Sequence, residues 1–375
     1  MYKKRIVTLI LVLTMLLSMM TFPASAVSAS NDSMLKSQMM QILASISHEK
    51  EFYGLKNVSL NNVTIGKEIP VYVVENQGLH CSDIRIFPVI AGSQMVSMFF
   101  STTLPSNEVY VQLGTELVPL LSPYVNTGEF AIIYDDVGVH VYTGSQIVQI
   151  GSRLVYPESI IEEDGVVTSR QEDILRLNTV DMLDARDISK IKVTSLAPAF
   201  ELDVSTMPQD TRATNASLNV GIIRQPSGTR ICWAITSVSI VNYILNSSLN
   251  YSTIVDQFSN GVDVGVPTSN VISLLNDHYN LNYLYSSSGT PTMPTILNSL
   301  SRGKPVFGDF TYSGGAHAVV IRGANFNART FSVMNPTPTT SGYTSGTVTN
   351  SNVWSFICAY SGVTMTLRYH GRYNG

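Results

Sequence analysis

Residues 225–246 read QPSGTRICWAITSVSIVNYILN, a loop rich in turn residues that gives way to a helical pattern at Ile231. The apolar side chains continue almost without interruption to Leu245, which predicts a central, mostly buried helix over residues 231–246. Cys232 lies at its start, where unpaired backbone N–H groups and the helix dipole favour a thiolate. Free cysteine is also among the most buried residue types, so this thiol by itself leaves both packing and catalysis open.

The pattern beyond this helix predicts an α+β domain over residues 215–375. Helical spacing of apolar residues comes first along the chain, and short β-rich runs follow it. The other expected elements are a strand at 220–223, helices at 269–276 and 294–300, and strands at 306–311, 317–322, 331–335 and 365–369.

Two polar residues are conspicuous in this layout. His317 follows Gly314-Gly315-Ala316 and opens an apolar strand, whereas Asn335 ends another strand and is held extended by Pro336. Antiparallel pairing of the two strands, through a turn at 323–328, would place these side chains close together.

Cysteine catalysis uses a set of this kind. A His within hydrogen-bond reach takes the thiol proton and later protonates the leaving amine, while a third group on its other nitrogen holds the ring in place. A donor to the developing oxyanion is also required. Gln225, seven residues before Cys232, can supply a side-chain N–H beside the backbone N–H of that cysteine.

These residues, taken in order, resemble the papain-like cysteine peptidases, most closely the compact secreted bacterial forms that are staphopain-like or process bacteriocin leaders. The resemblance covers roughly residues 218–370 and implies an α+β fold in which the cysteine helix packs on an antiparallel sheet. It implies that Cys232 is the nucleophile, His317 the general base and acid, Asn335 the residue that orients His317, and Gln225 the oxyanion donor.

The spacing departs from the larger enzymes of that family. His317 and Asn335 follow Cys232 by 85 and 103 residues, against about 130–150 in papain and the cathepsins. One extra residue separates Gln225 from the cysteine, and Pro336 replaces the usual Ser. The domain is therefore expected to be a trimmed version of the fold.

The first residues predict a secretory signal peptide over residues 1–26. Basic residues at 3–5 precede an apolar run at 6–20 and the small residues Ala24-Ser25-Ala26, which favours cleavage after Ala26. The run is shorter than the roughly 18 apolar residues of a membrane span. We expect a secreted, extracellular protein with no stable membrane anchor, an uncleaved anchor being the alternative.

The chain contains three cysteines, Cys81, Cys232 and Cys358, too few for a disulfide scaffold. An odd count leaves at least one free thiol. Pairing of Cys81 with Cys358 would leave Cys232 free, but the spacing does not decide this.

Charge divides the chain into two parts. Residues 215–375 hold eight Lys and Arg against four Asp and no Glu, a net +4, whereas residues 27–214 hold 12 basic and 23 acidic residues, a net −11. We expect a β-rich propeptide-like domain of antiparallel strands at 27–156, with one helix at 33–49, and an acidic connector at 157–214. The opposite charges favour docking of the two parts, so the N-terminal part is expected to act as folding aid and intramolecular inhibitor.

The favoured function is a secreted cysteine endopeptidase, made as a zymogen, that cleaves protein or peptide substrates through a thioester acyl-enzyme. One alternative keeps the thiol chemistry but acts on cell-wall peptides or transfers acyl groups. Another is a non-catalytic binding protein with an inert papain-like domain. The remaining histidines lack metal-ligand spacing, and the chain shows no phosphate loop or basic footprint. We therefore expect no metal, cofactor or nucleic-acid partner.

Overall fold

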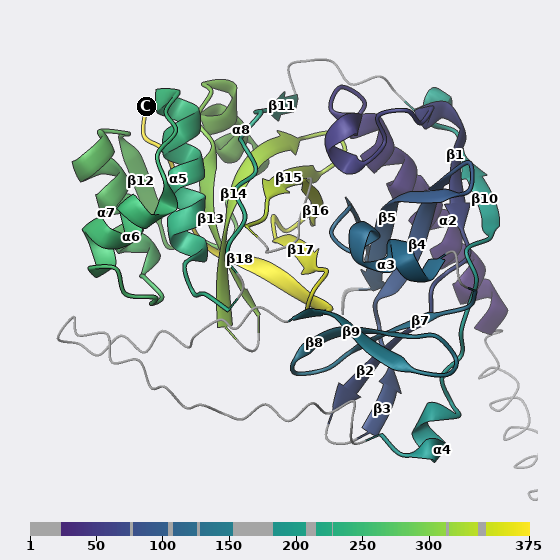
Figure 1. Cartoon of the computed structure of the whole chain (residues 1–375). Coiled ribbons are helices and arrows are strands. Elements are labelled where there is room, and N and C mark those ends of the chain that lie inside the picture. The colour runs from purple at the N-terminus through teal and green to yellow at the C-terminus, as the bar shows by residue number, and fades with distance from the viewer. Residues whose placement is uncertain are drawn as a thin grey trace, which may run out of the picture.

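The structure is mixed α+β, which confirms the predicted class (Figure 1). Of the predicted signal peptide, only residues 24–26 are described, and most of the expected connector at 157–214 also lies outside the described residues. This computed structural model describes residues 24–75, 78–103, 108–125, 128–152, 183–207, 215–226, 228–312, 315–336 and 343–375.

Helix α2 (Ala24–Ser45) contains most of the helix predicted over residues 33–49. Its apolar stripe is buried, with Met39 and Leu43 fully covered, and it contacts strand β6 (Val109–Gly114). The apolar spacing thus positions the helix against the first sheet.

The N-terminal region forms two five-stranded sheets. The first has the order β10 (Pro198–Leu202), β1 (Val63–Gly66), β4 (Arg85–Ala91), β5 (Gln94–Thr103) and β6. The second has the order β3 (Gly78–Cys81), β2 (Val71–Glu75), β7 (Ala131–Tyr134), β8 (Gly138–Tyr142) and β9 (Ile147–Ser152). Short helices are η1 (Lys50–Tyr53), η2 (Leu60–Asn62), α3 (Val118–Val125), α4 (Ala185–Ile188) and η4 (Val204–Thr206).

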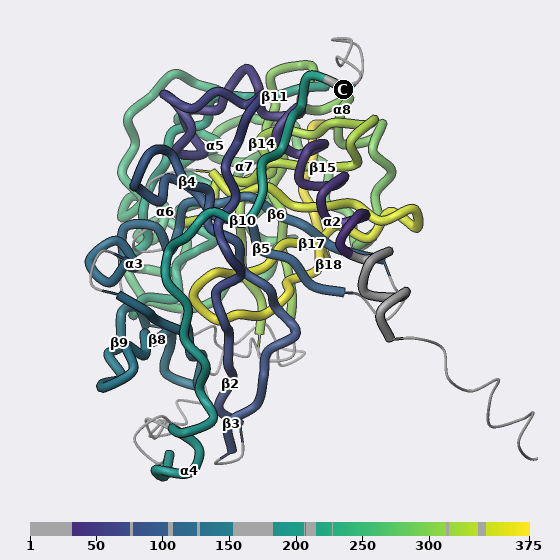
Figure 2. Tube along the Cα trace, turned by 90° about the vertical axis from the view of Figure 1, so that its right-hand side faces the viewer, coloured from purple at the N-terminus to yellow at the C-terminus, as the bar shows by residue number. Residues whose placement is uncertain are grey.

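Two pairings in this region differ from the sequence prediction. All strands were expected to be antiparallel, but β2 and β7 pair in parallel. Strand β10 lies in the segment expected to be a connector, and it pairs with β1. Figure 2 shows the segment that carries β10 running back along the N-terminal region before the chain enters the C-terminal region.

The C-terminal region is built on one eight-stranded sheet. Strand β15 pairs with both β14 and β16, so strands β13 to β18 close on themselves into a barrel, which leaves few free edges. The strands are β11 (Asn215–Ser217), β12 (Tyr283–Ser286), β13 (Val306–Tyr312), β14 (Gly315–Asn325), β15 (Thr330–Met334), β16 (Thr344–Val348), β17 (Trp354–Cys358) and β18 (Val363–Tyr373).

Helix α5 (Cys232–Leu245) packs against β14 and β13 and contacts α6 (Tyr251–Ser259) and α7 (Thr268–Tyr279). These helices lie on the side of the sheet opposite the N-terminal region (Figure 1). Helix α8 (Met293–Ser301) contacts β14, β13 and β18. The helices predicted around residues 231–246, 269–276 and 294–300 are therefore present, whereas α6 was not predicted.

The strand predicted at residues 220–223 is wrong. Its backbone groups are used elsewhere: the Val220 N–H donates to the Leu218 carbonyl, and the Val220 carbonyl accepts from the Tyr343 hydroxyl at 2.7 Å. The segment of this part of the chain that pairs with β14 is instead β11, which lies a few residues earlier. An apolar run was mistaken for a strand because its hydrogen bonds come from a distant side chain.

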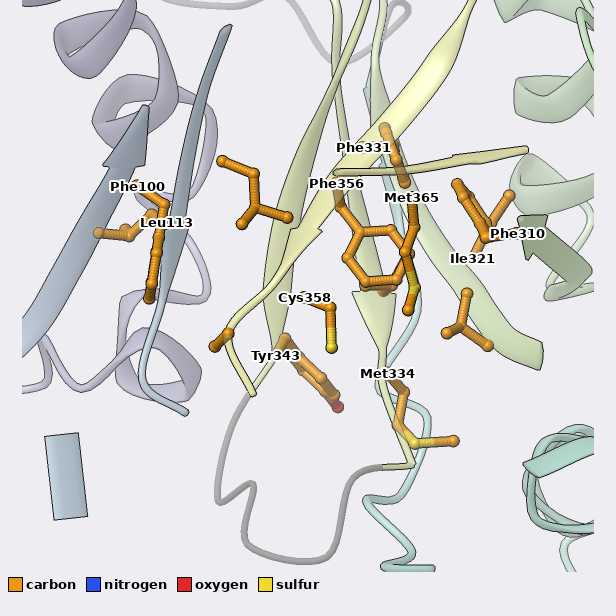
Figure 3. Close-up of a cluster of buried hydrophobic side chains, with 14 of the residues drawn as sticks. Phe100, Leu113, Phe310, Ile321, Phe331, Met334, Tyr343, Phe356, Cys358 and Met365 are labelled. Carbon is orange, nitrogen blue, oxygen red and sulfur yellow. The ribbon is translucent and has the colours of Figure 1, made fainter. Parts of the chain in front are cut away.

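The two regions share one hydrophobic core. Figure 3 shows Phe100 and Leu113, from β5 and β6, on one side of a buried cluster that includes Phe356 and Cys358 of β17. Polar contacts cross the same boundary. The Gln112 side chain bonds both to the carbonyl of Ile357, at 2.7 Å, and to its N–H, at 2.5 Å. The N-terminal region is thus packed on the barrel as part of the fold.

Candidate active site

Cys232 is the first residue of α5, as the local sequence predicted. It is partly buried and is a free thiol, as are the exposed Cys81 and the buried Cys358. Burial raises the pKa of this thiol, and the backbone N–H groups of Ala318, Trp233 and Cys232 itself lower it. The start of α5 and the neighbouring strand β14 therefore bring N–H groups close to the thiol.

Cys232 and His317 line one cavity of about 240 Å³. Its wall comes from the start of α5, from the loop before α7, and from strands β13, β14 and β18. Ala316 and Ala318 flank His317 in this wall, and Tyr369 of β18 adds an aromatic side. The cavity therefore lies where the start of α5 meets the sheet.

Strand pairing brings His317 to Asn335. Strands β14 and β15 are antiparallel, with Val320 opposite Met334, so the residue after β15 comes back beside the start of β14. His317 Nε2 lies 2.6 Å from Asn335 Oδ1, and both side chains are buried. Because an amide oxygen only accepts, Nε2 carries the proton in this arrangement and Nδ1 is the basic nitrogen.

Burial has the largest effect on the pKa values of Cys232 and His317. It raises the pKa of the Cys232 thiol to about 11, and the nearby charge of Asp309 acts in the same direction against the hydrogen bond from Ala318. Burial lowers the pKa of His317 to about 4, against the opposing effect of Asn335. The resting pair is therefore a thiol and a neutral imidazole, in which the imidazole is free of charge and able to accept a proton.

Gln225 makes its hydrogen bond within the loop that precedes α5. Its side chain is buried and donates from Nε2 to the carbonyl of Thr229, within its own loop. It does not line the cavity that contains Cys232. Its role as an oxyanion donor stays a prediction, whereas the backbone N–H groups of Cys232 and Trp233 lie at the start of α5.

Asp309 is a site residue that the sequence analysis missed. It lies on β13 directly opposite Ala318, lines the cavity, and accepts a hydrogen bond from Thr268 Oγ1 at 2.7 Å. Burial raises its pKa to about 6, while Thr268 and Arg368 oppose the rise. A lone carboxylate inside the apolar run at 306–310 was the available signal, since a buried charge needs a partner or a function.

One comparison with known proteins concerns the region that contains this cavity. Residues 217–357 match the model of the Peptidase_C39 like family. The matched segment contains Cys232, His317 and Asn335, and it covers less than half of the chain. It supports a cysteine peptidase of the papain-like kind. No curated protein matches the chain.

In the part of the chain that the structure describes, every helix falls short of the length or the apolar content needed to cross a membrane. Across the same residues, no group of three or more His, Cys, Asp or Glu side chains is arranged to hold a metal ion.

Replacing Asn335 with alanine should lower kcat by roughly 10²-fold, at the low end of what general acid–base catalysis contributes. The change removes the acceptor for Nε2–H, so the imidazole loses its fixed tautomer. Peptide hydrolysis per folded molecule measures the effect. Asn325→Ala is the matched control, because Asn325 is also buried on this hairpin but accepts from the Ala328 N–H. Equal losses in both variants would refute the orienting role.

Proposed function

We propose that the protein is a cysteine endopeptidase that hydrolyses peptide bonds with Cys232 as nucleophile, His317 as general base and acid, and Asn335 as the orienting residue. One observation carries the proposal. Cys232 and His317 line the same cavity. Asn335 bonds to Nε2 of His317, so that Nδ1 is the nitrogen that acts as the base. The family match over residues 217–357 supports the same chemistry.

The reaction follows from these positions. His317 takes the proton of Cys232 Sγ through Nδ1 as the sulfur attacks the scissile carbonyl carbon. The resulting imidazolium then protonates the leaving amine, the C–N bond breaks, and the acyl group remains on sulfur as a thioester. Water, deprotonated by His317, attacks the thioester and releases the carboxylic acid, and the proton returns to the thiolate. The enzyme ends in its starting state.

The oxyanion needs donors where its charge develops. The N–H groups of Cys232 and Trp233 lie beside the sulfur at the start of α5, where the helix dipole also favours negative charge. One N–H of Gln225 Nε2 donates to the carbonyl of Thr229, and the second N–H of the same amide can donate to the oxyanion. We propose that it does so when substrate binds.

The pH dependence of kcat/KM tests the base. His317 must be neutral to accept a proton, and burial lowers its pKa to about 4. We expect activity to persist below neutral pH and to fall as the pH approaches 4, where protonation of His317 removes the base. Rates on a fluorogenic peptide and the rate of thiol alkylation measure this. A half-loss near pH 6.5, the ordinary histidine value, would contradict it.

Substrate class and processing belong to the same proposal. Cleavage of casein supports an endopeptidase, whereas release of cell-wall peptides with casein left intact would favour a wall hydrolase. We propose that the chain is exported and made as a zymogen that is cut between its two regions. Mass mapping of secreted material, with activity measured before and after the cut, tests this. A full chain as active as the cut form would reject the inhibitory role of residues 27–214.

A further inference from the structure

A carboxyl group of the N-terminal region reaches the far side of the His317–Asn335 pair. Glu116 follows β6, and its side chain is only 1% exposed although it has no cationic partner among the groups that shift its pKa. One carboxyl oxygen, Oε1, accepts a hydrogen bond from Thr344 Oγ1 of β16. The backbone carbonyl of Glu116 accepts from the Tyr360 hydroxyl at 3.3 Å. The residue is therefore held firmly against the barrel.

Strand register places Asn335 beside this carboxyl, because Thr344 lies opposite Val333, two residues before Asn335. Glu116 Oε2 and Asn335 Nδ2 are both buried, and neither has another hydrogen-bond partner. The two side chains do not reach the geometry of a full hydrogen bond, yet they interact closely enough that Asn335 lowers the Glu116 pKa, which burial raises to about 7. Buried polar atoms that face each other in this way are expected to pair.

Gly114 leaves the room for this arrangement. A Cβ at that position would collide with Glu116 Oε2. The backbone at the end of β6 thus allows the carboxyl to lie where the Asn335 amide can reach it.

An interaction with Glu116 can determine whether Asn335 presents its Oδ1 or its Nδ2 to His317. An Asn side chain can turn over and present its NH₂ group where its oxygen was. The turned amide would offer a donor to His317 Nε2 and favour the tautomer with the proton on Nδ1, which cannot take the thiol proton. An acceptor at Oε2 favours the amide orientation that keeps Nδ2 toward Glu116 and Oδ1 toward His317. Hydrogen bonds in such a chain also strengthen one another.

We propose that Glu116 is a positioning residue for catalysis: its carboxyl accepts from Asn335 Nδ2 and thereby holds Oδ1 on His317 Nε2. The inference rests on the proposed peptidase function. It makes the N-terminal region part of the working enzyme, because this region stays packed on the barrel through the shared core after the proposed cut. The cavity itself is lined by residues between 230 and 369. Rates are therefore measured on the cut form with both parts present. Negative charge is not required, because a neutral carbonyl oxygen accepts the same bond.

Two substitutions, introduced in the full chain, distinguish whether Glu116 is needed as a hydrogen-bond acceptor or as a negative charge. Glu116→Leu removes the acceptor, and we expect kcat to fall by roughly tenfold to 10²-fold with KM unchanged, since only the base is affected. Glu116→Gln keeps a carbonyl acceptor for Asn335 while its NH₂ donates to the Thr344 hydroxyl, so kcat should stay close to that of the original protein. Tyr110→Phe is the matched control, because the Tyr110 hydroxyl accepts from the Thr347 N–H across the same boundary, at 3.1 Å. It should leave kcat per folded molecule unchanged.

The tautomer of His317 gives a readout that does not depend on turnover. In ¹⁵N-labelled protein we expect the proton on Nε2 in the original chain and in Glu116→Gln, and a shift toward Nδ1 in Glu116→Leu. If Glu116→Leu does not fold, Glu116→Asp replaces it, because its shorter carboxyl falls away from Asn335. The inference is overturned if Glu116→Leu keeps full kcat and the Nε2 tautomer, or if Glu116→Gln loses as much as Glu116→Leu. If the original chain cleaves no peptide but Glu116→Leu still shifts the tautomer of His317, the peptidase function is rejected and the positioning role is kept.

Discussion

Replacing Cys232 with alanine should abolish peptide hydrolysis, with kcat/KM reduced by roughly 10⁴-fold or more, as for removal of a nucleophile in other covalent peptidases. Without Sγ no acyl-enzyme forms, and His317 has no proton to transfer. The fold should be unaffected, because the change removes one atom from a partly exposed residue at the start of a 14-residue helix. Initial rates on a fluorogenic peptide, with circular dichroism to verify folding, measure the effect.

The other two cysteines supply the controls. Cys81 is exposed, so Cys81→Ala should keep full activity. Cys358 is buried in the core that the two regions share, so Cys358→Ala should lower stability and leave the rate per folded molecule intact. Alkylation by an epoxide-type thiol inhibitor should stop activity in both controls. Hydrolysis that survives in Cys232→Ala would place the nucleophile elsewhere.

Glu49→Ala should lower the free energy of unfolding by roughly 3–5 kcal/mol, the cost of leaving a buried charge without its partner. Arg322 of β14 is only 1% exposed and lies 2.6 Å from the Glu49 carboxylate. Its guanidinium also donates to the Ser332 hydroxyl at 2.8 Å and stacks over the Tyr343 ring at 3.9 Å. These contacts keep the guanidinium buried after Glu49 is removed, so its charge is no longer compensated. Urea unfolding measures the loss.

An exposed ion pair provides the comparison. Lys190 and Asp187 lie 2.8 Å apart, but the lysine side chain is 56% exposed. Lys190→Ala should change the free energy of unfolding by about 1 kcal/mol or less, because solvent screens such pairs. Equal shifts for Lys190→Ala and Glu49→Ala would show that the Glu49–Arg322 pair does not hold the two regions together.

The local sequence pattern was sufficient to predict those helices and strands that their own residues specify. The apolar run after Cys232 predicted α5, and the two apolar strands around the turn at 323–328 predicted the hairpin that joins His317 to Asn335. Helix α6 was not predicted because it is only nine residues long and five of them are polar, although the Asn250 side chain caps it by accepting from the Ser252 N–H at 3.0 Å. Strand β16 was missed because a glycine lies in its run of small polar residues, whereas β17 is rich in aromatic and apolar residues and its pattern was available.

The amino-acid sequence by itself determined which chemistry the chain carries and which short-range geometry supports it: a thiol at a helix start, and a His and an Asn at the ends of one hairpin. Only the tertiary structure decided what surrounds them. Asp309 enters the cavity through strand register, and Glu116 meets Thr344 across 228 residues of chain. The physical reason is that spacing along the chain constrains neighbours within an element or a hairpin. Contacts between distant sheets depend on how whole faces pack, which no local pattern encodes.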